Sequence, residues 1–241
     1  MKFYRRLQPI EALTFDLDDT LYDNRVVILR AERALKTWLL DHCPAMEAFD
    51  DKAWLKMRQD VLTAKPALFG FITDIRLAVI RLAATRCGLS EQSAAMLAED
   101  AVQFFLKHRS DIDVPQASVK LLKDLGQHYP LVAMTNGNVD TDMIGMTSLF
   151  NAVFRAGEDG KPKPAADLFS RAQIELGVCP STIFHVGDHL KADVRGARKA
   201  GFQTCWLNES GKSFRHQRHA TLLPDVEITN LESIRALLPR L

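Results

Sequence analysis

The residues of this sequence best suited to chemistry are four aspartates that directly follow the short apolar run ALTF. The stretch ALTFDLDDTLYDN, residues 12–24, contains Asp16, Asp18, Asp19 and Asp23. Carboxylates at this spacing repel one another, and burying them costs free energy unless a positive charge compensates. A hard divalent cation such as Mg2+ takes a few carboxylate oxygens beside a phosphate. The cluster therefore indicates a cation site that handles phosphate.

Further polar residues follow other apolar runs along the chain. Thr135 and Asn136 come directly after LVAM, and Asp188 comes after IFHVG, with Asp193 five residues further on. Ligands of open parallel sheets bind beyond the carboxyl ends of the strands. We therefore expect these side chains to converge with Asp16 at one edge of a sheet.

The elements that must position these residues alternate between strand-like and helical patterns. Strands are expected for ALTF at 12–15, LVAM at 131–134, IFHV at 183–186, TCWL at 204–207 and VEIT at 226–229. Three helices are expected between them. The first begins near Pro115, the second carries Leu168, Ala172 and Leu176 and ends at the C-terminal cap Gly177, and the third runs from about Leu190 to Gly201. Alternation of this kind is typical of an α/β fold with a parallel sheet covered on both faces.

One segment interrupts this alternation with helical periods alone. Apolar residues recur at helical spacing over residues 26–40, 54–62, 72–86 and 94–107, the last after a possible N-cap at Ser90. We therefore predict an all-helical inserted domain at residues 22–110. The α/β core domain is expected to comprise residues 1–21 and 111–241.

Composition narrows the possible partners. The 241 residues contain 31 Lys and Arg against 30 Asp and Glu, which gives no support to nucleic acid or a membrane surface as the main partner. The four cysteines form no CxxC pair, and no segment has the length of a membrane span. We expect a cytoplasmic protein with a small-molecule substrate. The basic stretch at residues 212–219 is expected to be a solvated loop.

The motifs DLDDT, TNG, KPAADLF and GDHLKAD resemble, in order and spacing, the four motifs of the haloacid dehalogenase-like hydrolases. The resemblance extends from residue 12 to about residue 207, and most members of this family are phosphatases. It implies a Rossmann-like core, a C1-type helical cap inserted after the first motif, and Mg2+ as cofactor. It also implies that Asp16 is the nucleophile that forms an aspartyl-phosphate, and that Asp18 donates a proton to the leaving group and then activates water.

The same resemblance assigns the remaining site residues. Asp16, the backbone carbonyl of Asp18 and Asp188 are the implied Mg2+ ligands, and Asp193 is implied to bind a metal water or to orient the lysine. Thr135 and the amide of Asn136 are implied to bind the phosphoryl oxygens, and Lys163 to offset their charge. Lys163 is preferred to Lys161 because Pro164 and Phe169 follow it at the family's spacing.

Other residues of the motifs have simpler interpretations. Asp19 stands where the family commonly has glycine, and Asp19 and Asp23 are expected to have capping or surface roles near a helix N-terminus. His185 lies within an apolar run and is expected to be a hydrogen-bonded core residue. His189 could either touch the site or be merely exposed.

Alternative functions remain open at this point. Asp18 favours phosphoryl chemistry over dehalogenation, because the dehalogenase branch lacks this second acid. A phosphosugar mutase shares the same motifs, and a non-enzymatic phospho-accepting signalling domain would also gather acids, Thr and Lys. The stretches TFDLDDTLYDN, IDVP, TNGN and HVGDHLKADVRGA resemble bacterial phosphatases of the riboflavin pathway. That resemblance implies 5-amino-6-(5-phospho-D-ribitylamino)uracil, FMN or sugar phosphates as substrates.

Overall fold

The computed structural model of the chain describes residues 1–211, 213–214 and 221–238. Most of the basic stretch at 212–219 therefore lies outside the described residues. The chain divides into two compact units. The core unit comprises Met1–Asn24, Asp113–Gly137 and Ile144–Leu241, and the helical unit comprises Arg25–Ile112 and Asn138–Met143. No helix in the described part of the chain combines the length and the hydropathy that a membrane span requires.

Within the described residues, the core unit is built on one seven-stranded sheet with the order β1-β7-β6-β5-β2-β3-β4. Its strands are β1 (Lys2–Phe3), β2 (Ala12–Phe15), β3 (Leu131–Thr135), β4 (Ala152–Arg155), β5 (Ile183–Gly187), β6 (Gln203–Leu207) and β7 (Val226–Ile228). Only the pairing of β1 with β7 is antiparallel. The central strands are buried along their whole length, which explains why the sequence shows them as unbroken apolar runs.

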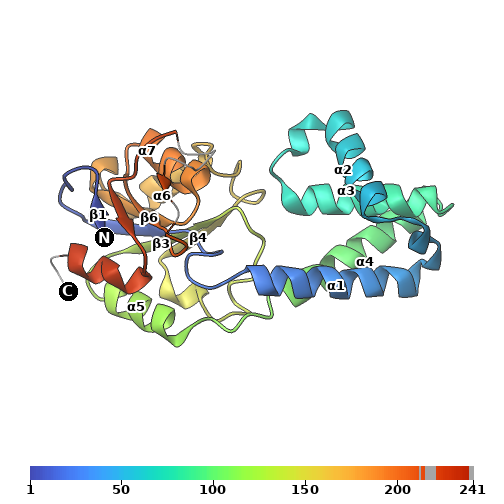
Figure 1. Cartoon of the computed structure of the whole chain (residues 1–241), viewed down its shortest axis with the longest axis horizontal. Coiled ribbons are helices and arrows are strands. Elements are labelled where there is room, and N and C mark those ends of the chain that lie inside the picture. Colours follow the sequence, from blue (N-terminus) through green and yellow to red (C-terminus); the bar gives the residue numbers. More distant parts are fainter. Residues whose placement is uncertain (212, 215–220, 239–241) are drawn as a thin grey trace. The chain divides into compact units, whose positions relative to one another are not determined.

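Helices cover both faces of this sheet. They are α5 (Gln116–Gly126), α6 (Asp167–Leu176), the π-helical turn η5 (Leu190–Arg195) continuing into α7 (Gly196–Lys199), and the 3-10 helices η3 (Thr147–Leu149), η4 (Pro180–Thr182) and η7 (Leu231–Leu237). Figure 1 shows α6 and α7 on one face and α5 on the other. The fold is therefore the α/β arrangement that the strand and helix patterns predict, with the Rossmann-like core that the family resemblance implies.

The central strand β2 places its carboxyl end between the ends of its two neighbours. Phe15 is in register with Ala133 of β3 on one side and with Val186 of β5 on the other, and both pairings are parallel. The segments that follow β2, β3 and β5 therefore leave the sheet at the same edge.

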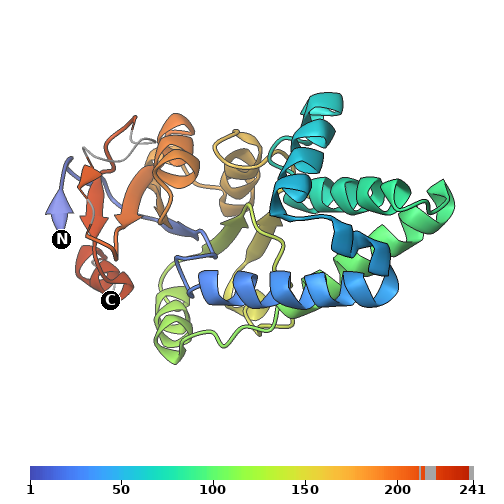
Figure 2. The same cartoon turned by 45° about the vertical axis from the view of Figure 1, so that its right-hand side comes forward.

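The helical unit contains α1 (Arg25–His42), α2 (Asp51–Ala64), α3 (Ile72–Arg86) and α4 (Glu91–Arg109), with the 3-10 turns η1 (Pro44–Ala48) and η2 (Pro66–Leu68). Figure 2 shows these helices packed together. A local signal marks the start of α4: the Ser90 hydroxyl accepts a hydrogen bond from the Ser93 amide, as the sequence predicts for an N-cap. Their apolar faces enclose a separate core that includes Leu35, Met57 and Phe105.

The segment Asn138–Met143 groups with the helical unit, although the sequence pattern assigns it to the core. The Asn138 side chain accepts a hydrogen bond from Arg109 at 3.1 Å and donates one to Thr73 at 3.0 Å. The Ser110 hydroxyl accepts a hydrogen bond from the Asp140 amide at 2.9 Å. These contacts join residues far apart in sequence, so no local pattern indicates them.

Candidate active site

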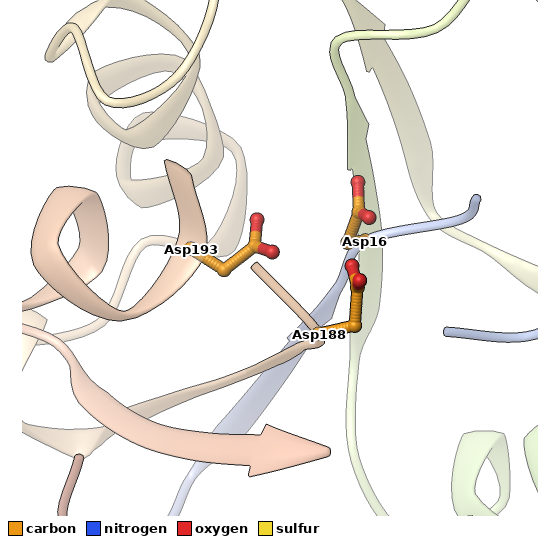
Figure 3. A group of neighbouring side chains, drawn as sticks. All are labelled: Asp16, Asp188 and Asp193. Carbon is orange, nitrogen blue, oxygen red and sulfur yellow. The ribbon is translucent and has the colours of Figure 1, made fainter. Parts of the chain in front are cut away.

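Two aspartates lie at the ends of adjacent strands. Asp16 follows β2 and its amide donates a hydrogen bond to the Val186 carbonyl at 2.9 Å, while Asp188 follows β5. Asp16, Asp188 and Asp193 each offer a carboxylate oxygen, and these oxygens all lie within 4.8 Å of one another (Figure 3). Asp16 and Asp188 are therefore close enough to share one cation.

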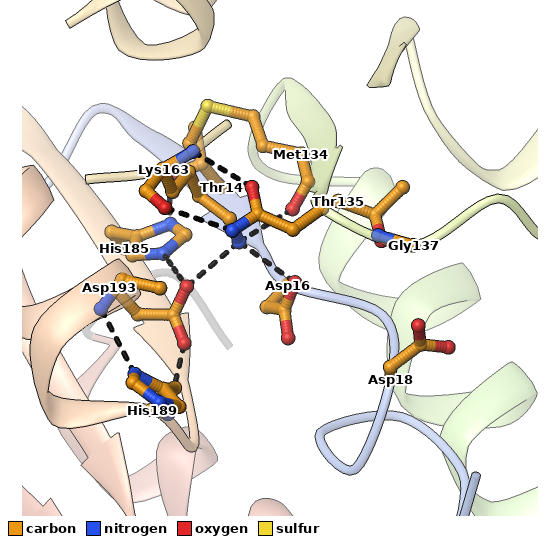
Figure 4. Close-up of polar contacts among 12 residues, drawn as sticks. Thr14, Asp16, Asp18, Met134, Thr135, Gly137, Lys163, His185, His189 and Asp193 are labelled. Carbon is orange, nitrogen blue, oxygen red and sulfur yellow. Dashed lines mark hydrogen bonds and ion pairs between the residues drawn. The ribbon is translucent and has the colours of Figure 1, made fainter. Parts of the chain in front are cut away.

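Lys163 is the basic residue of this cluster. Its ammonium nitrogen lies 2.7 Å from Asp16 Oδ1, 2.7 Å from Asp193 Oδ1 and 2.7 Å from the Met134 carbonyl oxygen (Figure 4). The residue is only 4% exposed, and burial alone would lower its pKa, but the two carboxylates outweigh burial and raise the pKa. The lysine is thus held charged, with three fixed acceptors for its three N–H donors. Lys161 is exposed and does not join this group.

Asp193 is held in place by contacts from several elements. Besides Lys163, it accepts hydrogen bonds from the His189 amide at 2.9 Å and pairs with the His185 ring at 3.3 Å. A Cβ added to Gly187 would lie 2.4 Å from Asp193 Cγ, so only glycine permits this close approach. Burial would raise the pKa of Asp193, but Lys163 outweighs it and lowers the pKa. Asp193 is therefore an ionised acid that orients the lysine.

His185 is a buried core residue of β5, as expected from its place in an apolar run. One ring nitrogen lies 2.9 Å from the Thr14 hydroxyl and the other faces Asp193. Burial lowers the pKa of His185, despite the opposite influence of Asp193. The ring is therefore neutral and links β2 to Asp193. His189 is exposed, and its ring accepts hydrogen bonds from the amides of Lys191 and Ala192 at the start of η5.

The two aspartates at the strand ends carry raised pKa values. Burial, opposed by Lys163 and assisted by Asp193 and Asp18, raises the pKa of Asp16 to about 7. Burial followed by the neighbouring carboxylates Asp193 and Asp16 raises the pKa of Asp188 to about 9. When Asp16 and Asp188 are both ionised, the single positive charge of Lys163 does not balance the carboxylates around it, and this part of the site carries excess negative charge.

The donor set fits Mg2+. Among the described residues, no side chain donates a hydrogen bond to Asp188, and its carboxylate faces that of Asp16 (Figure 3). The backbone of Asp188 is itself fixed, because the Trp206 indole donates to its carbonyl at 2.8 Å. Hard oxygen donors with no soft ligand beside them suit Mg2+ rather than a thiolate-binding metal.

The loop after β3 is tied to the lysine loop by Asn136. Its side-chain oxygen accepts from the Lys163 amide at 2.7 Å, and its side-chain nitrogen donates to the Lys163 carbonyl at 2.8 Å. The family resemblance assigns a role only to the Asn136 backbone amide, and no motif indicates this contact of its side chain with the Lys163 backbone. The Thr135 hydroxyl accepts from the Gly137 amide at 2.8 Å, and the residue is fully buried.

The turn after β2 contains the remaining acids of the first motif. Asp19 has φ of 58°, a left-handed conformation that glycine adopts most easily and that Asp tolerates better than most residues. Its carboxylate accepts a hydrogen bond from the Asn24 amide at 2.9 Å, one residue before α1 begins, and so fixes the chain that leads into the helix. Asp23 is exposed. Asp18 is half-buried, and its carboxylate accepts a hydrogen bond from the Tyr22 hydroxyl at 2.8 Å.

Comparison with known proteins identifies relatives over nearly the whole chain. The family described as haloacid dehalogenase-like hydrolase matches residues 10–201. The 5-amino-6-(5-phospho-D-ribitylamino)uracil phosphatase YigB of Escherichia coli (strain K12) is 42% identical over 99% of this chain and 100% of its own length. The N-acylneuraminate-9-phosphatase of Rattus norvegicus is 28% identical over 85% of each chain.

A solved structure shares the whole fold. The structure described as 2-haloacid dehalogenase from Pseudomonas syringae pv. Tomato DC3000 superposes with a TM-score of 0.88 and 32% identity, and covers 95% of this chain and 97% of that one. The two sequence relatives named above are thus phosphatases by name, and this structural relative is a dehalogenase by name.

Proposed function

We propose that this chain, which belongs to the haloacid dehalogenase-like hydrolase family and is one of its phosphatases, hydrolyses small phosphorylated metabolites through an aspartyl-phosphate on Asp16. The observation that carries the proposal is the contact of Asp16 with Lys163, beside Asp188, at the ends of adjacent parallel strands. A nucleophile, a fixed cation and a cation-binding acid thus lie at one sheet edge.

Mg2+ held by Asp16, Asp188 and the backbone carbonyl of Asp18 would supply charge neutralisation for the phosphate and keep Asp16 ionised. Lys163 neutralises a further charge from its fixed position. Thr135 and the Asn136 amide are the proposed donors to the phosphoryl oxygens. The Asn136 side chain, by holding the Lys163 backbone, keeps these donors and the lysine in one geometry.

The reaction proceeds in two displacements. An Asp16 oxygen forms a bond to phosphorus while the bond to the leaving oxygen breaks, and Asp18 gives its proton to that oxygen. Water then forms a bond to phosphorus, the Asp16–phosphorus bond breaks, and Asp18 takes the proton from water. Asp16 and Asp18 are thereby returned to their starting states, with inorganic phosphate and an alcohol as products.

We propose 5-amino-6-(5-phospho-D-ribitylamino)uracil as the physiological substrate, with FMN and sugar phosphates as further substrates. The support is the 42% identity with the phosphatase of that name over its full length. We propose that the protein acts in the cytoplasm, and cell fractionation can test this location.

The helical unit is the proposed cap that selects among substrates. It contains a cavity of about 810 Å³, lined among others by Trp54, Arg58 and Arg76. Four acids, Glu32, Glu47, Asp50 and Asp51, also line it, and Arg76 is paired with Glu32, so the aromatic ring rather than the net charge makes this cavity a candidate site for a ring-containing ligand. Replacing residues 25–112 by the corresponding segment of a relative should then change the ranking of substrates, and an unchanged ranking would place specificity in the core unit.

The decisive experiment measures phosphate release from the pyrimidine intermediate, FMN and a set of sugar phosphates, with Mg2+ or EDTA. Asp16→Asn should abolish release while keeping the fold, whereas Asp100→Asn, an exposed acid on α4, should change nothing. Chloride release from a 2-haloacid in place of phosphate release would refute the proposal. Transfer of phosphate between positions of one sugar without release would instead identify a mutase.

A further inference from the structure

A tight turn brings Tyr22 back over Asp18. The Asp19 amide donates to the Tyr22 carbonyl at 2.9 Å, and the Leu21 amide donates to the Leu17 carbonyl at 2.9 Å. An isolated β-bridge pairs Asp18 with Tyr22 directly. The backbone of the turn thus fixes the distance between residues 18 and 22.

The tyrosine side chain is fixed as firmly as its backbone. Tyr22 is only 4% exposed, although it belongs to a turn, and its hydroxyl donates to Asp18 Oδ1 at 2.8 Å. The preceding residue is anchored to the core unit, because the Ser118 hydroxyl of α5 donates to the Leu21 carbonyl at 2.7 Å. A buried phenol on an anchored turn offers a rigid donor.

The carboxylate that receives this hydrogen bond lies apart from the lysine network. Figure 4 shows Asp18 beyond Asp16, on the side opposite to Asp193. The Tyr22 hydroxyl reaches Asp18 from the turn after β2, whereas the Lys163 ammonium reaches Asp16 from the loop before α6. Tyr22 therefore acts on Asp18 from a different segment than the lysine that holds Asp16.

We propose that Tyr22 is a positioning residue that orients the carboxyl group of Asp18 for proton transfer. This inference rests on the proposed function, in which Asp18 protonates the leaving oxygen and then accepts a proton from water. A proton moves efficiently only along a short, aligned contact, so fixing one carboxyl oxygen fixes the direction of the transfer. Tyr22 itself exchanges no proton with substrate in this scheme.

Comparing substrates with different leaving groups tests this role of Tyr22. An alkyl phosphate needs full protonation of its leaving oxygen, whereas p-nitrophenolate leaves with little help. Tyr22→Phe keeps the buried ring and removes only the hydroxyl. We expect kcat for a sugar phosphate to fall about tenfold and kcat for p-nitrophenyl phosphate to fall less than about twofold.

Tyr4, which follows the edge strand β1, offers a matched control for the loss of a tyrosine hydroxyl. The Tyr4 hydroxyl also donates to a carboxylate, Glu227 Oε2, at 2.5 Å. Tyr4→Phe should leave both rates unchanged. Thermal melting of both variants confirms that each is folded before the rates are compared.

Coupling to Asp18 completes the test. In an Asp18→Asn background, adding Tyr22→Phe should not lower the residual rate further, because the group that Tyr22 orients is gone. Equal losses on the two substrates, no loss on either, or an undiminished effect in the Asp18→Asn background would each overturn the role of Tyr22. A wild-type protein that releases no phosphate from either substrate would overturn the proposed function and this inference together.

Discussion

Replacing Asp188 by asparagine tests the electrostatic cost that the site carries when no cation is bound. Burial and the neighbouring carboxylates raise the pKa of Asp188 from 3.8 to about 9. At pH 7, folding therefore requires this group to take up a proton that the unfolded chain does not hold. Asparagine has nearly the same shape without the charge, so Asp188→Asn should stabilise the metal-free protein.

The size of the effect follows from the interval between the unfolded pKa and the working pH. That interval is about three pH units at pH 7, which at about 1.4 kcal/mol per unit gives a ceiling of about 4 kcal/mol. Asp188 retains contact with solvent, and solvent weakens its repulsion by the neighbouring carboxylates. We therefore expect Asp188→Asn to raise the free energy of unfolding by about 2 kcal/mol at pH 7. Because the folded pKa is raised, the cost grows as pH rises from about 4 towards about 9 and shrinks below about 1 kcal/mol near pH 5.

Urea unfolding in EDTA at pH 5 and pH 7 measures this cost directly. The free energy of unfolding of Asp188→Asn should exceed that of the wild type at pH 7, and the difference should narrow at pH 5. The exposed control Asp100→Asn should differ from wild type by less than about 0.5 kcal/mol. Mg2+ should stabilise the wild type and not Asp188→Asn. A variant no more stable than wild type in EDTA at pH 7, or an advantage that grows at pH 5, would refute the reasoning.

Three further predictions concern the surroundings of this acid. Lys163→Met should abolish phosphate release and lower the free energy of unfolding by about 3–5 kcal/mol, because it leaves the buried carboxylates of Asp16 and Asp193 without their cation. The control Lys161→Met should change neither quantity. Gly187→Ala should lower kcat and the melting temperature together, because the added Cβ would overlap Asp193; an unchanged kcat would contradict this. Trp54→Ala should change the ranking of substrates in the release assay and also lower the melting temperature, because Trp54 packs against the core of the helical unit; an unchanged ranking would count against the cap as selector.

The sequence predicts the central part of the fold because the central strands are buried on both faces. β2, β3 and β5 appear as apolar runs, and each is followed at once by a site residue. The edge strand β4 was not predicted, since all four of its residues are half-exposed and its apolar run is only three residues long. Gly177, with φ of 64°, ends α6 as its position in the sequence predicts, because a left-handed helix cap is a local preference.

Within the site, strand ends were predictable and side-chain directions were not. The motif spacing favoured Lys163 over Lys161, and the structure brings Lys163 to Asp16. The clamp of the Asn136 side chain on the Lys163 backbone could not be foreseen, because it depends on how two loops meet. The close approach of Asp193 to Gly187 was not predicted, although the sequence contains a signal for it. Gly187 stands directly before Asp188, at the end of a strand whose other residues are bulky.

The two halves of the acidic cluster differ in how their charge is balanced. Asp193 is compensated within the chain, by Lys163 and by hydrogen bonds from β5 and the start of η5, and its pKa is lowered. Among the described residues, Asp188 has no hydrogen-bonded cation; Lys163 lowers its pKa only from a distance, and burial with the neighbouring carboxylates raises the pKa to about 9. Asp16 contacts the lysine and its carboxylate lies beside that of Asp188. Since one buried cation cannot neutralise three carboxylates, the charge that remains is located at Asp16 and Asp188, where a divalent ion would both complete the balance and keep Asp16 ionised for attack on phosphorus.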